Sequence, residues 1–352
     1  MSTNLDHAAH HPNRDHVHAS RSSPVVDLPE IPVLDTGPDF PLETLLQATD
    51  RAHALMDLAT RGVPRAALHA LDGVSRRWLA KSTSPHLSEI DQIARQLDRP
   101  GAYFLSVNYE WGCTTGVRPA PDGVGAQLVR VLDWRTNGLG RHVVAARVSC
   151  ALGPFISLTW PGYTGVLQAV APGRFAAAIN QAPMPRTGGG FYPLDWFANK
   201  VRVWSLTHET ASHVLRHVFE TAADFDAARR LLIETPIASP VIYALSGRAP
   251  SELCIIERRE AEARVHDGPA AAANAWRTPD WQGRPRGDAN PERICLLEEA
   301  TLAGDDDMSW LEAPVLNPLT RLAMIANASK AAVTAQGFED GQPATAVLTL
   351  RR

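Results

Sequence analysis

The spacing of hydrophobic residues divides the chain into a helical N-terminal part and a strand-rich remainder. In the N-terminal part, apolar residues recur at helical spacing and predict amphipathic helices over 42–60, 64–81 and 88–97. Pro64 suits the start of the second helix, and Ser88 is expected to cap the third. The pattern therefore predicts a small helical unit ahead of the rest of the chain.

Beyond residue 140, short apolar runs separated by Gly and Pro predict strands. A succession of them forms an expected antiparallel meander over 141–149, 154–159, 162–170 and 174–180. The faces of such a sheet need cover. Helices are predicted next over 207–220 and 224–234. Later strands are predicted at 238–246 and 253–258, extending the second sheet, and at 319–326 and 346–350.

A turn signal lies between these two parts. Pro121, Asp122 and Gly123 predict a hairpin. If the chain reverses near Gly123, Cys113 lies opposite Asp133, and Arg130 is on the same arm as the carboxylate. One short hairpin would then gather a thiol, a guanidinium and a carboxylate.

Such a group of side chains suits nucleophilic catalysis. A cationic partner lowers the pKa of a thiol and raises the fraction of thiolate, which is the form that attacks carbonyl groups. A carboxylate can fix the guanidinium or hold a protonated amine. The plain alternative is a buried cysteine on a strand, beside an ordinary surface pair of Arg130 and Asp133.

Residues on both arms of the hairpin resemble the acid ceramidase and N-acylethanolamine acid amidase group of N-terminal nucleophile (Ntn) hydrolases. This group is related to the choloylglycine hydrolases, which act on bile salts. The resemblance rests on Asn-Tyr-Glu at 108–110, Cys-Thr-Thr at 113–115 and Arg-x-x-Asp at 130–133. It continues in the Pro-Gly motifs at 161–175 and in Pro-Val-Leu-Asn-Pro-Leu-Thr at 314–320, and it covers the chain from about residue 31 to the C-terminus.

The resemblance implies an α+β fold, a four-layer αββα sandwich preceded by a helical prosegment. It also implies that the precursor cuts itself between Gly112 and Cys113. The expected organisation is a disordered polar tail over 1–30, a prosegment over 31–112 that becomes the small chain, and a catalytic domain over 113–352.

The resemblance further implies a role for each residue of the site. Cys113 is the nucleophile, and its freed α-amine serves as base. Arg130 holds the region of the substrate carbonyl and favours the thiolate, while Asp133 orients the amine. Asn274 supplies a hydrogen-bond donor to the oxyanion.

A second arginine and several substrate contacts are expected outside the hairpin. Arg286 is the predicted second catalytic arginine, and Arg284 competes for that place. Where the family has an acidic residue in an Asn-Glu-Arg motif, this chain has Gln181, so no acidic role is assigned there. The candidate substrate contacts are Asn180, Trp134, Trp160 and Tyr163.

A glycine-rich stretch followed by aromatic residues occupies 187–204. It has neither the Lys-Ser/Thr ending nor the context of a phosphate loop. One interpretation is a flexible aromatic rim beside the nucleophile that accepts an apolar acyl chain. The other is a loop whose aromatic side chains pack onto the core.

Composition and charge exclude several other classes of protein. The 352 residues are 45% hydrophobic and carry a net charge of -4, which fits a globular enzyme and predicts no nucleic-acid partner. The cysteines show no C-x-x-C spacing and no disulfide framework, so neither a metal nor an organic cofactor is expected. The His-rich start has no apolar signal region, so a cytoplasmic location is expected, and contact with a membrane is left open.

The predicted function is hydrolysis of a linear amide with an apolar acyl chain, such as an N-acylethanolamine or a ceramide-like lipid. The cleaved prosegment is the expected partner, retained as the small chain. Two alternatives stay open. An acyltransferase of the same fold would pass the acyl group to an amine, and a non-catalytic binding protein would retain only the fold.

Overall fold

The computed structural model describes residues 28–107, 111–187, 189–300 and 303–351. Residues 1–27 of the predicted polar tail lie outside this description, and so do Asn108, Tyr109 and Glu110 of the family motif. Over the described ranges, no helix is both long enough and apolar enough to cross a membrane.

The larger of two sheets contains the predicted meander. Its strand order is β1-β4-β5-β6-β7-β8-β9-β10, and every neighbouring pair is antiparallel except β1 with β4. A short 3₁₀ helix at Leu139–His142 precedes β4. The strand expected over 162–170 begins only at Gln168. The bounds are β1 (Val33–Gly37), β4 (Val144–Val148), β5 (Phe155–Thr159), β6 (Gln168–Ala171), β7 (Phe175–Gln181), β8 (Val241–Ser246), β9 (Leu253–Arg258) and β10 (Ala263–Asp267).

The smaller sheet contains the predicted hairpin. Its order is β11-β2-β3-β12-β13-β14, and β15 also pairs with β13. The strand chosen for 319–326 is confirmed as β12, whereas the last predicted strand is shorter than expected. The bounds are β2 (Trp111–Pro119), β3 (Ala126–Trp134), β11 (Ala270–Ala272), β12 (Thr320–Asn327), β13 (Ala332–Glu339), β14 (Gln342–Pro343) and β15 (Leu348–Leu350).

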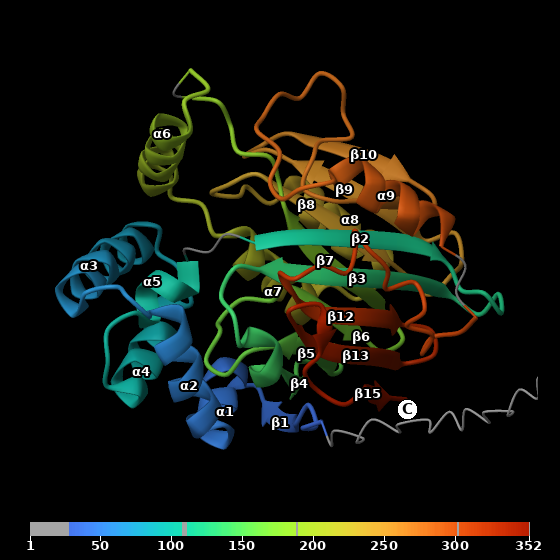
Figure 1. Ribbon diagram of the computed structural model, residues 1–352, viewed down its shortest axis with the longest axis horizontal. Coiled ribbons are helices and arrows are strands. Elements are labelled where there is room, and N and C mark those ends of the chain that lie inside the picture. The colour runs from blue at the N-terminus through green and yellow to red at the C-terminus, as the bar shows by residue number, and fades with distance from the viewer. Residues whose placement is uncertain (1–27, 108–110, 188, 301–302, 352) are drawn as a thin grey trace, which may run out of the picture.

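The two sheets pack face to face between helices, with β2 and β3 of the smaller sheet against β7 and β8 of the larger (Figure 1). On the outer side of the larger sheet lie α7 (Ala211–Thr221) and α8 (Phe225–Glu234), and α9 (Asn290–Glu299) packs on β2 and β11. Because β7 is covered on both faces, six of its seven residues are buried and it reads as a nearly continuous apolar run. The predicted four-layer αββα sandwich is confirmed.

The helical N-terminal segment, residues 40–107, lies beside one end of the sandwich (Figure 1). The helix expected over 42–60 is divided, because Ala48 leaves the helical conformation with φ -134° and ψ 45°. Ser88 lies inside the fourth helix, whose N-cap is His86 with no side-chain capping hydrogen bond, so the predicted capping role of Ser88 is wrong. The bounds are α1 (Phe40–Gln47), α2 (Thr49–Ala59), α3 (Arg65–Lys81), α4 (Leu87–Leu97) and α5 (Ala102–Val107).

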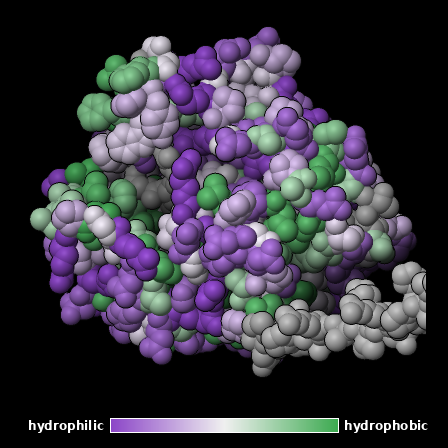
Figure 2. Space-filling view, in the orientation of Figure 1, coloured by the Kyte–Doolittle hydropathy of each residue, from purple (hydrophilic) through white to green (hydrophobic). Residues whose placement is uncertain are grey.

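A helix, α6 (Tyr192–Ser205), stands where the sequence predicted a flexible rim. Several of its apolar side chains face solvent, with Phe191 63%, Leu194 56% and Phe197 60% exposed. Figure 2 shows hydrophobic side chains gathered on the surface at this end of the molecule. These side chains do not pack onto the core, whereas Trp204 at the end of the stretch packs against the buried cluster that contains Trp78 and Ile90. The second interpretation therefore holds for Trp204 alone among these.

Candidate active site

The register of the β2–β3 hairpin decides which residues meet at its open end. Cys113 is paired with Leu132, so the expected pairing with Asp133 is wrong by one residue. The chain reverses between Asp122 and Gly123 and not at Gly123 itself. Because successive side chains of a strand point to opposite faces, this shift places the thiol and the carboxylate on different faces of the hairpin.

The inner face of the hairpin, which looks toward the larger sheet, carries Cys113 and Arg130. The guanidinium Nη2 donates to the Cys113 sulfur at 3.0 Å, and Nη1 donates to the Ile179 carbonyl at 2.5 Å and to Asn180 Oδ1 at 3.2 Å. Cys113 is 0% exposed and Arg130 1% exposed. The predicted pair of thiol and guanidinium is thus in contact, and the larger sheet binds the other side of the guanidinium through Ile179 and Asn180.

In the uncut chain, burial has the largest effect on the pKa of the Cys113 thiol. Desolvation raises the pKa of Cys113 to about 12, and the Arg130 charge only partly offsets it. The thiol is therefore protonated at neutral pH. Arg130 acts in the expected direction, since its charge lowers the pKa of the thiol, but in the uncut chain removal from water outweighs it. Its role in the cleaved enzyme stays a prediction.

The outer face of the hairpin, which looks toward α9, carries Asp133 beside Gly112. Arg293 Nη1 donates to Asp133 Oδ2 at 2.9 Å, and the Thr320 hydroxyl donates to Oδ1 at 2.9 Å. A Cβ at Gly112 would lie 3.3 Å from Asp133 Cβ, so a larger residue there would crowd the carboxylate. Burial raises the pKa of Asp133 more than Arg293 lowers it.

Asn274 links the two faces through the peptide between Gly112 and Cys113. Continuing the register in which Ala272 pairs with Thr115 places Asn274 opposite Cys113, just beyond the end of β11. Its Oδ1 accepts the Cys113 N–H at 2.7 Å and Arg293 Nη2 at 3.2 Å. Both partners are donors, which fixes the oxygen on this side of the amide. The predicted donation to an oxyanion stays a prediction, since Nδ2 here donates to the Gln181 carbonyl at 2.7 Å.

Gln181 binds the backbone of Trp111, the residue that precedes Gly112. Its Oε1 accepts the Trp111 backbone N–H at 3.0 Å. The position where the family has an acidic residue therefore still supplies an oxygen acceptor, now a neutral one. Together with Asn274, it holds the backbone N–H groups of Trp111 and Cys113.

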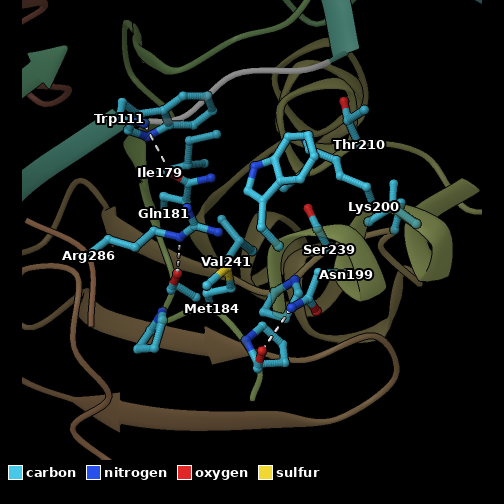
Figure 3. Close-up of a pocket in the computed structure, with 18 of the residues that line it drawn as sticks. Trp111, Ile179, Gln181, Met184, Asn199, Lys200, Thr210, Ser239, Val241 and Arg286 are labelled. Carbon is cyan, nitrogen blue, oxygen red and sulfur yellow. Dashed lines mark hydrogen bonds between the residues drawn. The ribbon is translucent and has the colours of Figure 1, made fainter. Parts of the chain in front are cut away.

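Two cavities border this part of β2. One, of about 550 Å³, is lined by Trp111, Gly112, Asp133 and Arg293 among others. A smaller one of about 110 Å³ lies under α6 and is also lined by Trp111. Figure 3 shows this smaller cavity with Trp111 and Arg286 on one side and Lys200 on the other. Since Cys113 is fully buried, neither cavity reaches its sulfur.

The predicted second arginine is at the edge of the site. Arg286 lines both cavities and donates from Nε to the Ala182 carbonyl at 3.1 Å. Arg284 donates to the Gly190 carbonyl and lies 5.5 Å from the Tyr192 ring centroid. The arginines that contact Cys113 and Asp133 among the described residues are Arg130 and Arg293.

The candidate substrate contacts divide into two groups. Trp134, Trp160 and Tyr163 come together around an apolar cavity of about 200 Å³ between the helical N-terminal segment and the sandwich. Asn180 does not line the described cavities. It bridges the sheets, accepting from Thr115 at 2.7 Å and donating to the Ala272 carbonyl at 2.9 Å. Contact of any of them with substrate stays a prediction.

Arg293 is the site residue that the sequence reasoning missed. It is 2% exposed and joins Asp133 to Asn274. Its signal lies in the buried stripe of α9, where Asn290, Arg293 and Leu297 are the buried residues. An arginine on the apolar face of an amphipathic helix needs a buried partner, and Asp133 provides it.

Comparison with known proteins relates the chain to amide-cleaving enzymes. No family model matches it. It is 29% identical over 236 residues to the N-acylethanolamine-hydrolyzing acid amidase of Rattus norvegicus, covering 64% of this chain and 62% of that protein. It is 29% identical over 109 residues to acid ceramidase of Mus musculus, and 30% identical over 108 residues to that of Homo sapiens. Each of these matches covers 31% of this chain and 26% of the ceramidase. The chain thus matches between about a quarter and three fifths of the length of these relatives.

Among solved structures, the chain is similar to the Caenorhabditis elegans ortholog of N-acylethanolamine-hydrolyzing acid amidase, with a TM-score of 0.49, 19% identity and coverage of 62% of this chain and 93% of that one. A conjugated bile acid hydrolase from Clostridium perfringens gives a TM-score of 0.40 at 8% identity, covering 68% and 92% of the two chains.

The fold is an α+β sandwich of two facing sheets with helices outside them. The sequence is similar to acid ceramidase and N-acylethanolamine-hydrolyzing acid amidase, which confirms the resemblance seen in its motifs.

Proposed function

We propose that the protein is an amidohydrolase that cleaves a linear carbon–nitrogen amide bond through Cys113, after self-cleavage has made this cysteine N-terminal. The observation that carries the proposal is the set of hydrogen bonds around the peptide between Gly112 and Cys113. Arg130 contacts the Cys113 sulfur, and Asn274 accepts the Cys113 N–H from the other side. The relatives are named as hydrolases of amides, which favours the same reaction class here.

Self-cleavage follows from chemistry within this peptide. The Cys113 sulfur attacks the Gly112 carbonyl carbon, and the C–N bond breaks as the nitrogen takes up the proton that the thiol loses. Water then hydrolyses the thioester, leaving a carboxylate on Gly112 and a free α-amine on Cys113. Asn274 and Gln181 support this step by fixing the N–H groups on both sides of the glycine.

Cleavage would also supply the base that the buried thiol lacks. An α-amine has a reference pKa of about 7.7 to 8.0, so near neutral pH it can accept the thiol proton. The sulfur then attacks the substrate carbonyl, the amine product leaves with the proton, and water releases the acid. In this proposal Arg130 stabilises negative charge at the sulfur, and Asp133, on the neighbouring strand, holds the protonated amine.

Access to the sulfur requires the residues before Cys113 to move. Trp111 lines both the 550 Å³ and the 110 Å³ cavities. Its departure with Gly112 would join these cavities and uncover the inner face of the hairpin. The uncut chain is accordingly inactive in this proposal.

The helical N-terminal segment would remain attached as the small chain. Arg216 on α7 forms a 2.8 Å ion pair with Glu89 on α4, and both side chains are largely buried. Trp78 Nε1 donates to the Leu206 carbonyl at 2.9 Å. The apolar cavity lined by Trp134 and Trp160 lies between this segment and the sandwich, where it suits an acyl chain.

The test is hydrolysis of a fluorogenic N-acyl amide by wild type, Cys113→Ala and Cys254→Ala. Cys254 is a matched control, because it is also 0% exposed and burial raises its pKa to about 12 as well. Loss of the Cys113 thiol should lower the rate at least ~1000-fold, as removal of a nucleophile does, while Cys254→Ala should retain activity.

An added amine acceptor separates hydrolysis from acyl transfer. Free acid as the main product supports the hydrolase, and a new amide in its place identifies an acyltransferase. Equal rates for wild type and Cys113→Ala would contradict the proposal.

A further inference from the structure

Arginines dominate the 550 Å³ cavity beside Gly112. Its ionisable lining residues are Asp133, Arg135, Arg284, Arg286, Asp288 and Arg293. Among the described lining residues, four cations and two anions sum to a formal charge of +2, although the whole chain carries -4. The positive charge is therefore a local property of the cavity.

The ion pairs of the site reduce this charge, since Arg284 also pairs with the buried Asp195, but they leave Arg135 without an ion pair among the described residues. Arg293 and Asp133 neutralise each other at 2.9 Å. Arg135 is exposed at the end of β3 and has no hydrogen-bond or ion-pair partner among the described residues. The Arg284 side chain is 38% exposed, and Asp195 Oδ2 is 3.9 Å from its Nη2. Two guanidinium groups from separate segments thus keep donors near the cavity.

The surroundings add an apolar component. Arg284 lies against the Tyr192 ring, which also lines the cavity. Trp134 lines this cavity and the apolar 200 Å³ cavity as well. One indole therefore borders both an arginine-rich space and an apolar space, an arrangement that fits the two ends of an amphiphilic amide.

We propose that the substrate is an N-acyl amide whose amine portion carries a carboxylate, as in an N-acyl amino acid. The carboxylate would bind Arg135 and Arg284, because guanidinium groups bind carboxylates through charge-assisted hydrogen bonds. The acyl chain would lie on the other side of Trp134. This inference rests on the proposed amidohydrolase function and names its substrate class.

Binding to uncut Cys113→Ala protein provides a test that does not need cleavage. The probes are N-decanoylglycine and N-decanoylethanolamine, which differ by a carboxylate in place of a hydroxymethyl group, and their dissociation constants are measured by calorimetry. We expect the glycine amide to bind about 10-fold more tightly, as one or two charged hydrogen bonds would give, and the preference to shrink in high salt.

Variants assign the preference to the cavity. Arg135→Gln and Arg284→Gln should each reduce it, and the double variant should remove it. Arg248→Gln is the control, because Arg248 is also exposed but its backbone lies near Gly125, at the opposite end of the hairpin from Gly112. Equal affinity for the two amides in Cys113→Ala, or a preference that survives in the double variant, would overturn the proposal.

Turnover by wild type distinguishes this failure from failure of the proposed function. If both amides are hydrolysed with equal kcat/KM, the enzyme reaction stands and the carboxylate preference is wrong. If the glycine amide binds selectively but neither amide is hydrolysed, the cavity retains its ligand class and the amidohydrolase proposal fails.

Discussion

The two faces of the β2–β3 hairpin hold charged groups in different ways. On the inner face, Arg130 is buried beside a neutral thiol and bonds to a backbone carbonyl and an amide. On the outer face, Asp133 is buried with a full counter-charge from Arg293. Among the described residues, the inner face therefore holds a cation that bonds to no carboxylate, and the outer face holds a neutralised pair.

This difference indicates which face of the hairpin can stabilise a negative charge on a reacting group. A buried guanidinium without a carboxylate gains most when a negative charge forms next to it, and the Cys113 sulfur is the group that can supply one. The outer pair is already neutralised, and in the uncut chain it fixes Asn274 through Arg293. In the uncut chain, variants of the outer face should therefore mainly change stability, and variants of the inner face should mainly change the rate of self-cleavage; the role proposed for Asp133 in holding the amine begins only after cleavage.

The largest effect is expected on the outer face. Arg293→Met leaves Asp133 buried without its cation, which costs about 3 to 5 kcal/mol of stability. The double variant Asp133→Asn with Arg293→Met should recover much of this loss. Denaturant unfolding in a Cys113→Ala background measures both. Arg321→Met is the control for breaking a buried ion pair elsewhere in the fold. Arg321 forms a similarly buried 3.2 Å pair with Glu339, away from Gly112. A negligible loss in Arg293→Met would show that the outer pair is not a structural support.

On the inner face, Arg130→Met should slow self-cleavage on the order of 100-fold, the effect of losing one preorganised donor to a developing charge. Its folded stability should change less than that of Arg293→Met, because no anion is left unpaired. Arg258→Met is the matched control. Arg258, the last residue of β9, is also 0% exposed and donates to the backbone carbonyls of Glu262 and Thr235, so its loss should leave the cleavage rate unchanged. Normal cleavage in Arg130→Met would remove the distinction between the faces.

The pH dependence of stability tests whether burial or the ion pair controls Asp133. Its pKa is raised in the folded chain, so the folded state binds more protons than the unfolded state between the ordinary pKa and the raised one. This contribution is present at low pH and is lost as pH rises. The stability of the uncut chain relative to its Asp133→Asn variant should therefore fall between pH 4 and pH 7. A rise over this range would mean that Arg293 outweighs desolvation.

The smallest effect comes from matched threonines. Thr320 donates to the Asp133 carboxylate and Thr115 to the Asn180 amide oxygen, at 2.9 and 2.7 Å. Bonds to charged groups contribute about 1.5 to 3 kcal/mol and neutral ones about 1 kcal/mol. Thr320→Val should accordingly destabilise the fold more than Thr115→Val. Thermal unfolding compares them, and the reverse order would contradict the assignment of charge to the outer face.

Much of the fold could be predicted from local pattern. The hairpin, α3 and most of the meander carry turn residues or periodicity, so their expected positions are close to those observed, apart from the late start of β6 at Gln168. The strand β12 was chosen although the periodicity of 319–326 also allowed a helix. The split between α1 and α2 was missed because the apolar spacing continues across Ala48. The helix α6 was missed because its exposed aromatic residues do not follow an amphipathic pattern.

The site was predictable where it lies within one hairpin and less so where it joins distant segments. Cys113 and Arg130 lie on the same face of one hairpin, two residues apart in the register, and the sequence predicted that they are close. Their exact register depended on a shift of half a step in the turn, which the Pro-Asp-Gly signal does not fix. Arg293 reaches Asp133 across a sequence separation of 160 residues, and only the packing of α9 on the smaller sheet reveals that contact.

The most direct test of the central proposal is the intact mass of purified protein after incubation at pH 5 and pH 7.5, with Cys113→Ala alongside. Self-cleavage predicts two fragments from wild type that meet at Gly112 and Cys113, and a single chain from the variant. A single uncut wild-type chain at both pH values would contradict the proposal, because Cys113 would then have neither a free α-amine nor an accessible sulfur.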